Sequence, residues 1–321
     1  MRSPHFIAWP TLCMTVLSSS ACTKDDGGSM QIEAAVTTKF IAMQDGAPED
    51  VLWDEESQTL FIFDNIGNRV WTWTDGNGLA GEPRATCAPP EGQSTLPENV
   101  TLGQADQLAD GTLIVTRFGI PGGDAMYGGV VVVKPDGTSD LVPNVDPSLH
   151  RLGVAVTEDD VIYVAGFAAA GGMPAGKITR VELDTGETLI ADGFGKVVGL
   201  AIADDRLYIS DQSGGKVLDA PLADLPEHAT DWHTFAEIAA PDQICIGPRG
   251  SLFSGQFQAP MNSSDPIAVR RMSADGHVSI VAADPDVSKP SGVSYDPTHK
   301  RLFVADAGNV AHVGIHVFPV D

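Results

Sequence analysis

The amino-acid sequence predicts an all-β protein folded as a six-bladed β-propeller, with four antiparallel strands in each blade. Two observations support this prediction: no window shows a convincing helical stripe, and one strand motif recurs along the chain. The motif is a polar turn followed by Leu or Ile, an aromatic or aliphatic residue, and usually another aliphatic residue. It occurs six times, at residues 60–62, 113–115, 162–164, 207–209, 252–254 and 302–304.

The spacing of this motif sets the size of each repeat. Consecutive motifs begin 45 to 53 residues apart, which leaves room for four strands and matches one propeller blade. Glycine-containing turns support the same interpretation, because glycine permits the positive φ of tight hairpins. They lie at residues 134–137, 183–186 and 273–276. Two separate β-sandwiches are the alternative, and the even spacing without a linker favours the propeller.

Both ends of the expected propeller carry apolar segments that suit the closure of the ring. A propeller protects its strand edges when one blade takes strands from both ends of the chain. Residues 31–43 and residues 313–318 are the two segments that fit this role. We therefore assign the propeller to residues 31–321.

The first residues predict an export signal rather than part of the fold. Arg2 precedes a short apolar stretch at residues 6–17, which is too short for a permanent membrane-spanning helix. The small residues that end in Cys22 resemble the lipobox of bacterial lipoproteins. This resemblance implies a signal peptide at residues 1–21, lipidation of Cys22, and a tether at residues 22–30. Ordinary secretion with cleavage near this point is the alternative.

The charge of the chain restricts its partners. The sequence has 19 basic and 43 acidic residues, a net charge of −24, which repels phosphate backbones and anionic lipid surfaces. We expect that the protein binds no nucleic acid. We expect it to contact a membrane only through the N-terminal lipid. The protein should be exported and anchored to a bacterial membrane, facing the periplasm or the cell exterior. We expect a monomer that binds a small molecule in its central funnel or a protein on its top face.

Two cysteines remain in the expected propeller. Cys87 and Cys245 would lie in a compartment that permits disulfides. Cys245 stands within an apolar run, which is equally typical of a small buried side chain. The sequence leaves both possibilities open.

Two stretches of the chain resemble the regucalcin and gluconolactonase family. Residues 49–54, EDVLWD, are similar to the family's entry into the first blade, and residues 241–246, PDQICI, are similar to a second family motif. The resemblance implies a six-bladed propeller that hydrolyses sugar lactones with a divalent metal, calcium being the expected ion, in the central funnel. Other segments, such as residues 302–306, look like NHL-type propeller repeats.

Carried over by position, the resemblance makes Glu49 and Asp242 metal ligands and makes Asp242 the general base. This fits physical expectation, because carboxylates at the starts of the innermost strands converge on the propeller axis, where a hard cation relieves their repulsion. A carboxylate beside such a cation can deprotonate water while the cation polarises a carbonyl group. The alternatives are a solvated turn residue for Glu49 and an Asx-turn for Asp242.

Three positions depart from the family pattern. Val198 stands where the family has a third metal ligand, and Thr101 and Gly103 stand where it has substrate-contacting Arg and Asn side chains. Asp50 and Gln104 are nearby candidates to complete a calcium shell, together with backbone carbonyls and water. Two hypotheses therefore remain: a metal-dependent lactonase, or a non-catalytic ligand- or protein-binding propeller with a degenerate metal site.

Other polar residues have weaker claims. Arg117 and His150 precede or end expected strands from which they could reach the funnel and bind a substrate. An aspartate also ends the second strand of several blades at the same offset, and this recurrence favours a structural turn cap. These aspartates are Asp64, Asp211 and Asp306.

Overall fold

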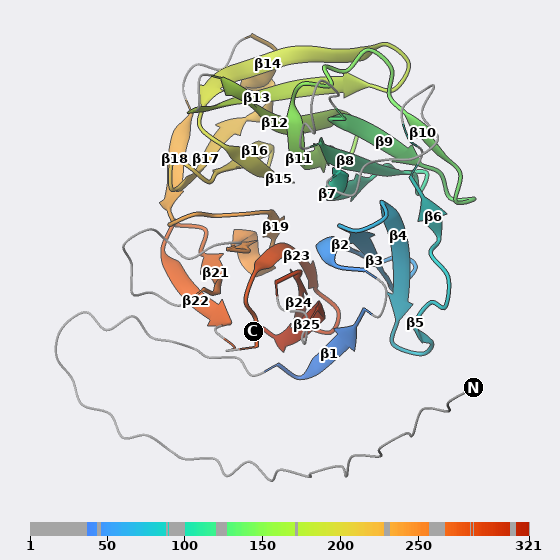
Figure 1. The fold of residues 1–321 in the computed structure, drawn as a ribbon. Coiled ribbons are helices and arrows are strands. Elements are labelled where there is room, and N and C mark those ends of the chain that lie inside the picture. Colours follow the sequence, from blue (N-terminus) through green and yellow to red (C-terminus); the bar gives the residue numbers. More distant parts are fainter. Residues whose placement is uncertain are drawn as a thin grey trace, which may run out of the picture. The chain divides into compact units, whose positions relative to one another are not determined.

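The computed structural model folds the chain into six β-sheets, one for each blade of a propeller (Figure 1). The structure describes residues 37–43, 46–87, 89, 100–119, 127–170, 173–227, 232–256, 267–282, 284, 286–308 and 313–320. The expected signal peptide, Cys22 and the tether lie outside the described residues. Two short 3₁₀ helices, η1 (Leu222–Glu227) and η2 (Pro248–Gly250), accompany the strands.

The first three blades follow one another along the chain. The first blade contains β2 (Pro48–Asp54), β3 (Thr59–Asp64), β4 (Arg69–Thr74) and two short strands that both pair with β4, namely β5 (Gly78–Leu79) and β6 (Ala85–Thr86). The second contains β7 (Val100–Gln107), β8 (Leu113–Gly119), β9 (Gly129–Val133) and β10 (Ser139–Leu141). The third contains β11 (His150–Val156), β12 (Ile162–Ala170), β13 (Met173–Glu182) and β14 (Gly186–Phe194).

The last three blades complete the ring. The fourth contains β15 (Val197–Ala203), β16 (Arg206–Asp211), β17 (Lys216–Pro221) and β18 (His233–Glu237). The fifth contains β19 (Ile244–Ile246), β20 (Leu252–Ser254), β21 (Val269–Met272) and β22 (Val278–Ala282). The sixth contains β23 (Pro290–Asp296), β24 (Arg301–Asp306), β25 (Gly314–Pro319) and β1 (Lys39–Ala42).

The repeated motif of the sequence forms the second strand of every blade. The motifs fall in β3, β8, β12, β16, β20 and β24, which confirms the predicted six-bladed arrangement. Ring closure is also as expected: β1, from the N-terminal side, pairs antiparallel with β25 as the outer strand of the sixth blade. Figure 1 shows the first described strand, in blue, beside the last strand, in red.

The hydrophobic core lies between neighbouring blades, and this explains why the second strands are apolar on both faces. In β3, Phe61 and Phe63 pack with Leu113 between the first and second blades. Ile62, on the opposite face of the same strand, packs with Phe303 between the first and sixth blades. Because each sheet is sandwiched between two others, alternate side chains of these strands are buried on either side.

The two cysteines of the described propeller are both free. Cys87 is buried in the core between the first and second blades, where burial raises its pKa to about 12. Cys245 lies on β19, and burial likewise raises the pKa of its thiol. Cys245 is partly rather than fully buried, it packs against the core between the fifth and sixth blades, and the two thiols form no disulfide.

In the described part of the chain, no helix is both long enough and apolar enough to cross a bilayer.

Candidate functional site

The first strands of the blades carry irregularities near their starts, and these position the candidate site. The pairing register of the first strand shifts around Glu49 in the first blade, Leu152 in the third, Val198 in the fourth and Ser291 in the sixth. Such β-bulges change the direction of a side chain. Because all four lie at the start of a first strand, they belong to the same end of the central channel.

Glu49 and Asp242 meet at this end of the channel. The Ser291 hydroxyl donates a hydrogen bond to Glu49 Oε1 at 3.1 Å, and the same hydroxyl lowers the pKa of the nearby Asp242 carboxyl. The amide of Asn65 donates to Glu49 Oε2 at 2.9 Å. The structure thus brings together the two expected ligand residues from the first and fifth blades, with Ser291 of the sixth blade between them. We call Glu49 and Asp242 the carboxylate pair.

Burial dominates the electrostatics of the carboxylate pair. Glu49 is 9% exposed and Asp242 is 5% exposed. Removal from water is the main cause that raises the pKa of Glu49 to about 7, and the negative charge of Asp242 is the second cause. Removal from water also raises the pKa of Asp242 to about 6, although the charge of Lys196 opposes this shift. Two desolvated carboxylates of this kind are typical of functional sites, where a bound cation or proton relieves them.

The recurring aspartates hold the loops that lead into the site. Asp64 Oδ1 accepts the backbone N–H of Ala47 at 3.0 Å, two residues before Glu49. Asp211 Oδ2 accepts the N–H of Gly195 at 3.1 Å in the loop before the fourth blade. Asp306 accepts two backbone N–H groups, both at 2.9 Å, from the loop that enters the sixth blade. The predicted structural caps are therefore found, and they also position the site.

Lys196 is a site residue that the sequence analysis did not identify. Its Nζ donates to Gln212 Oε1 at 2.7 Å and lies 5.4 Å from the centroid of the Phe167 ring. Its charge lowers the pKa of both members of the carboxylate pair. The one feature of the sequence that indicates a site role for Lys196 is its position, two residues before Val198 in the loop that enters the fourth blade.

Val198 belongs to an apolar group that faces the site from the other blades. Leu152, Phe167 and Val198 form a buried cluster, against which Phe118 packs. We call these four residues the apolar wall. The side chain at the expected third-ligand position therefore packs against hydrophobic neighbours, and no metal ligand stands there.

His150, one of the two expected substrate-binding residues, borders the apolar wall. Its ring centroid lies 4.9 Å from that of Phe118 and 5.2 Å from that of Phe167. Burial lowers the pKa of His150, and the charge of Lys196 lowers it further. The imidazole is therefore neutral near pH 7.

Arg117, the other expected substrate-binding residue, lies elsewhere. Its side chain is 2% exposed, and its Nε donates to the Tyr127 carbonyl at 2.9 Å. Burial lowers its pKa to about 10, and the Cys87 thiol lies nearby. Arg117 thus lies in the core between the first two blades, and its contact with a substrate stays a prediction.

The departure at Gly103 has a structural cause. A Cβ atom on Gly103 would lie 2.5 Å from Thr116 Oγ1 and 3.0 Å from the backbone of Leu152. The second and third blades approach too closely here for any side chain. Gly103 is required for packing, and no Asn-like contact can come from this position.

Gln104 is occupied by the backbone of neighbouring blades and is not available as a metal ligand. Its Nε2 donates to the carbonyls of Leu200 at 2.9 Å and Ile244 at 3.0 Å. Its Oε1 accepts the N–H groups of Leu200 at 2.9 Å and Val154 at 3.2 Å. One side chain therefore bonds the third, fourth and fifth blades to the second.

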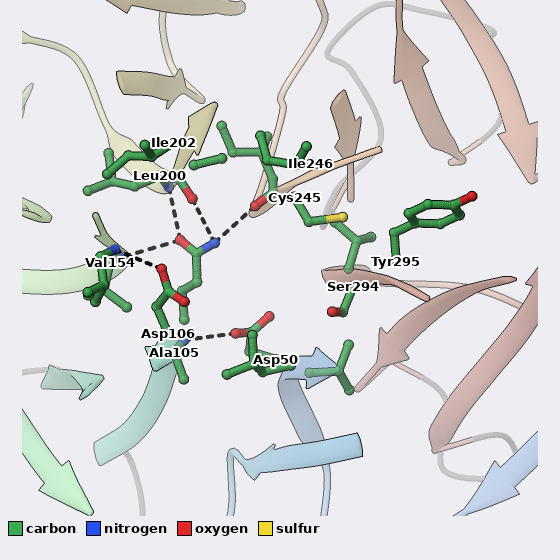
Figure 2. Close-up of a pocket in the computed structure, with 17 residues that line it drawn as sticks. Asp50, Ala105, Asp106, Val154, Leu200, Ile202, Cys245, Ile246, Ser294 and Tyr295 are labelled. Atoms are coloured by element: carbon green, nitrogen blue, oxygen red, sulfur yellow. Dashed lines mark hydrogen bonds between the residues drawn. The ribbon is translucent and has the colours of Figure 1, made fainter. Parts of the chain in front are cut away.

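A cavity of about 300 Å³ lies along the channel, lined by all six first strands (Figure 2). Asp50 and Asp106 line it, and their carboxylates accept the backbone N–H groups of Ala105 at 2.9 Å and Val156 at 2.7 Å. The inner edges of the first strands have no neighbouring strand, so side chains supply these partners. Asp50, expected as an additional ligand, therefore has a structural role in the channel wall.

The carboxylate pair suits an open cation site better than a closed cage. Within the described residues, no group of three or more His, Cys, Asp or Glu side chains could share a metal ion. The donors present are two carboxylates and the Ser291 hydroxyl, all hard oxygen ligands that suit calcium or magnesium. Next to Asp242, both polar atoms of the Gln243 amide are buried without a partner among the described residues. A divalent cation fits here if water completes its shell.

Glu49→Gln is expected to stabilise the metal-free protein at high pH. The folded pKa of about 7 lies above the ordinary value of 4.5, so the folded state binds more protons than the unfolded chain between these values. Stability therefore falls as pH rises through this window. In EDTA, the variant should gain roughly 2 kcal/mol at pH 8 and almost nothing at pH 4.

Urea unfolding at the two pH values measures this difference. Glu56→Gln is the matched control, because Glu56 is exposed on the first blade. A Glu49→Gln variant that gains no more than Glu56→Gln at pH 8 would show that burial of Glu49 does not disfavour its charge.

The fold and the carboxylate pair define a class: six-bladed propellers with an acidic site at one end of the channel. The solved structures that resemble this chain include a gluconolactonase from Xanthomonas campestris, with 17% identity, a TM-score of 0.65, and coverage of 91% of this chain and 93% of that one. A calcium-binding protein, regucalcin, from Agrobacterium tumefaciens has 12% identity, a TM-score of 0.61, and coverage of 85% and 90%.

A luciferin-regenerating enzyme has 14% identity, a TM-score of 0.61, and coverage of 85% and 90%. At these identities the likeness establishes the fold shared with gluconolactonase- and regucalcin-like propellers. No protein-family model matches the chain, and no curated protein matches it in sequence.

Proposed function

We propose that this protein is an exported, lipid-anchored hydrolase of a sugar lactone or a similar ester, assisted by a divalent cation, with calcium as the first candidate. One observation supports this most directly: two buried carboxylates from different blades, Glu49 and Asp242, lie beside the Ser291 hydroxyl at one end of the channel. The fold shared with a gluconolactonase and a calcium-binding regucalcin agrees with the proposal.

Asp242 is the group that moves the proton. Its pKa of about 6 leaves it ionised at neutral pH and still basic enough to accept a proton from water. The water oxygen attacks the lactone carbonyl carbon as Asp242 takes this proton. The ring C–O bond then breaks, and the proton passes from Asp242 to the departing ring oxygen, which gives the open hydroxy acid.

Glu49 and Ser291 orient the reacting groups. Glu49, with Asp242, would hold the cation, and the Ser291 hydroxyl fixes Glu49 Oε1 at 3.1 Å. When bound, a divalent cation polarises the carbonyl group that the water attacks. The apolar wall limits access of water from the opposite side and leaves a dry surface for the carbon skeleton of the substrate.

Calcium stabilisation and lactone hydrolysis test the proposal together. A site filled at 100 times its dissociation constant adds about 2.7 kcal/mol, which raises the melting temperature by several degrees. We expect this rise in melting temperature with calcium or another divalent cation. We also expect the protein to hydrolyse glucono-δ-lactone, as measured by pH-stat, and EDTA to abolish this hydrolysis. The proposal fails if cation-loaded protein hydrolyses no lactone above background.

The second candidate function is a non-catalytic binding propeller. The observation that favours it is the packing of Val198 in the apolar wall, where a third ligand would otherwise stand. Such a protein would show no melting shift with calcium, magnesium, manganese or zinc, while it still bound a ligand in the funnel or a protein on its top face.

Export with lipidation has its own test. We expect Cys22→Ala to move nearly all of the protein from the membrane fraction to the soluble exported fraction. The reason is that the acyl chains attached to Cys22 are the only membrane anchor proposed. Fractionation with immunoblotting measures this shift. Unchanged membrane association of the variant would exclude Cys22 as the anchor.

A further inference from the structure

Lys196 brings a positive charge to an otherwise acidic site without being neutralised at close range. Within the described part of the chain, its Nζ bonds the neutral Gln212 amide at 2.7 Å, and no carboxylate lies within 4.0 Å of it. Two of the three donor positions of the ammonium group therefore have no protein acceptor in this region. A cation held in this way is suited to bind an anion from outside the protein.

His150 supplies a second unsatisfied group on the same side of the site. Its side chain is 8% exposed, and its Nδ1 is buried without a hydrogen-bond partner among the described residues. Leaving such a group unpaired is unfavourable. Because Nδ1 has no exposed surface, the imidazole must rotate for a ligand hydroxyl to reach it, and that hydrogen bond would then remove this cost.

Phe167 connects the two groups. Its ring lies 5.4 Å from Lys196 Nζ and 5.2 Å from the His150 ring, measured to its centroid, and Phe118 lies 4.9 Å from His150 on the other side. The ammonium and the imidazole thus border one aromatic surface. This surface faces the same channel end as the carboxylate pair, since the charge of Lys196 acts on both carboxylates.

We infer that Lys196 and His150 form an anion subsite, and that the ligand of this site is a hydroxylated carboxylate. The Lys196 ammonium binds the ligand carboxylate, His150 Nδ1 bonds a ligand hydroxyl, and the carbon skeleton lies on Phe118 and Phe167. A ligand carboxylate brings one negative charge near Glu49 and Asp242, whereas a phosphate dianion brings two, so the carboxylate is repelled less.

The inference rests on the proposed function in placing the ligand beside the carboxylate pair, but it requires neither hydrolysis nor a metal. In that function, the anion is an acid group that the lactone already carries at another carbon. The subsite would then select lactones that bear a carboxylate.

Three probes with one six-carbon skeleton test the subsite: glucarate with two carboxylates, gluconate with one, and sorbitol with none. Isothermal titration calorimetry with the mature protein in EDTA measures binding without chelation by a metal. We expect both acids to bind at least about tenfold more tightly than sorbitol, because a charge-assisted bond contributes more than 1.4 kcal/mol. Equal affinities for gluconate and sorbitol would overturn the inference.

Two variants assign the effect to Lys196. Lys196→Met should weaken gluconate binding about tenfold and leave sorbitol binding unchanged, and Lys196→Arg should retain most of the preference. Lys134→Met is the matched control, because Lys134 pairs with Asp140 on an exposed hairpin. A Lys196→Met variant that keeps the full preference for gluconate would contradict the inference.

The calcium-induced melting shift distinguishes this inference from the proposed function. Removal of a positive charge near the carboxylate pair should preserve or enlarge the shift in Lys196→Met, while gluconate binding falls. A wild-type protein with no calcium shift but a clear gluconate preference supports the subsite and contradicts the metal-dependent hydrolase. A calcium-induced melting shift without a preference for gluconate contradicts the subsite and supports the cation site of the proposed hydrolase.

Discussion

Asp242→Asn is expected to lower kcat/KM for lactone hydrolysis by about three orders of magnitude. Loss of a general base costs about 10²–10⁴ in rate, and the same substitution removes one of the two charged donors to a divalent cation. Asn keeps the size and most hydrogen bonds of Asp, so the fold should persist. The calcium-induced rise in melting temperature should disappear in the same variant.

Asp106→Asn is the matched control for this experiment. Asp106 is also removed from water, which likewise raises its pKa to about 6, but it lines the channel cavity and bonds the backbone of Val156 (Figure 2). Its substitution should change hydrolysis by less than about twofold, since it touches no reacting group. If Asp242→Asn retains activity and Asp106→Asn loses it, the base lies in the cavity and the proposed assignment is wrong.

The architecture was predictable from sequence because each blade repeats one local pattern. The buried second strands need apolar side chains on both faces, so the Leu60 and Leu302 motifs look alike although they lie at opposite ends of the chain. The closing strand was predictable for a related reason: an exposed strand edge requires a partner, and only the chain ends remained.

The composition of the site was predictable only in part. Glu49 and Asp242 stood in longer motifs, but Ser291 and Lys196 have no local signal because their roles depend on neighbours in other blades. Ser291 bonds Glu49 across 242 positions of sequence.

Arg117 and Val198 illustrate the converse difficulty. An arginine at the end of a strand looks accessible in the sequence, yet strand alternation turns Arg117 into the core between two blades. Val198 looks like a lost ligand, and only its contacts with Leu152 and Phe167 reveal an apolar wall.

Gln104→Met is expected to destabilise the propeller by roughly 3–5 kcal/mol. The Gln104 amide satisfies two carbonyls and two N–H groups on the inner strand edges, of Leu200, Ile244 and Val154. Met has a similar volume but cannot bond them, and each buried group left unpaired costs about 1–3 kcal/mol. Water entering from the channel cavity would recover part of this cost, which keeps the total below the sum.

Urea unfolding followed by tryptophan fluorescence measures this loss, and Gln107→Met provides the comparison on the same strand. Gln107 is only partly buried, so its substitution should change stability by less than about 0.5 kcal/mol. The melting temperature of Gln104→Met should fall by about 10 °C. Gln104 bonds three other blades at one point. If Gln104→Met lost no more stability than Gln107→Met, packing between blades alone would hold the ring closed. The polar contacts across the channel would then be dispensable.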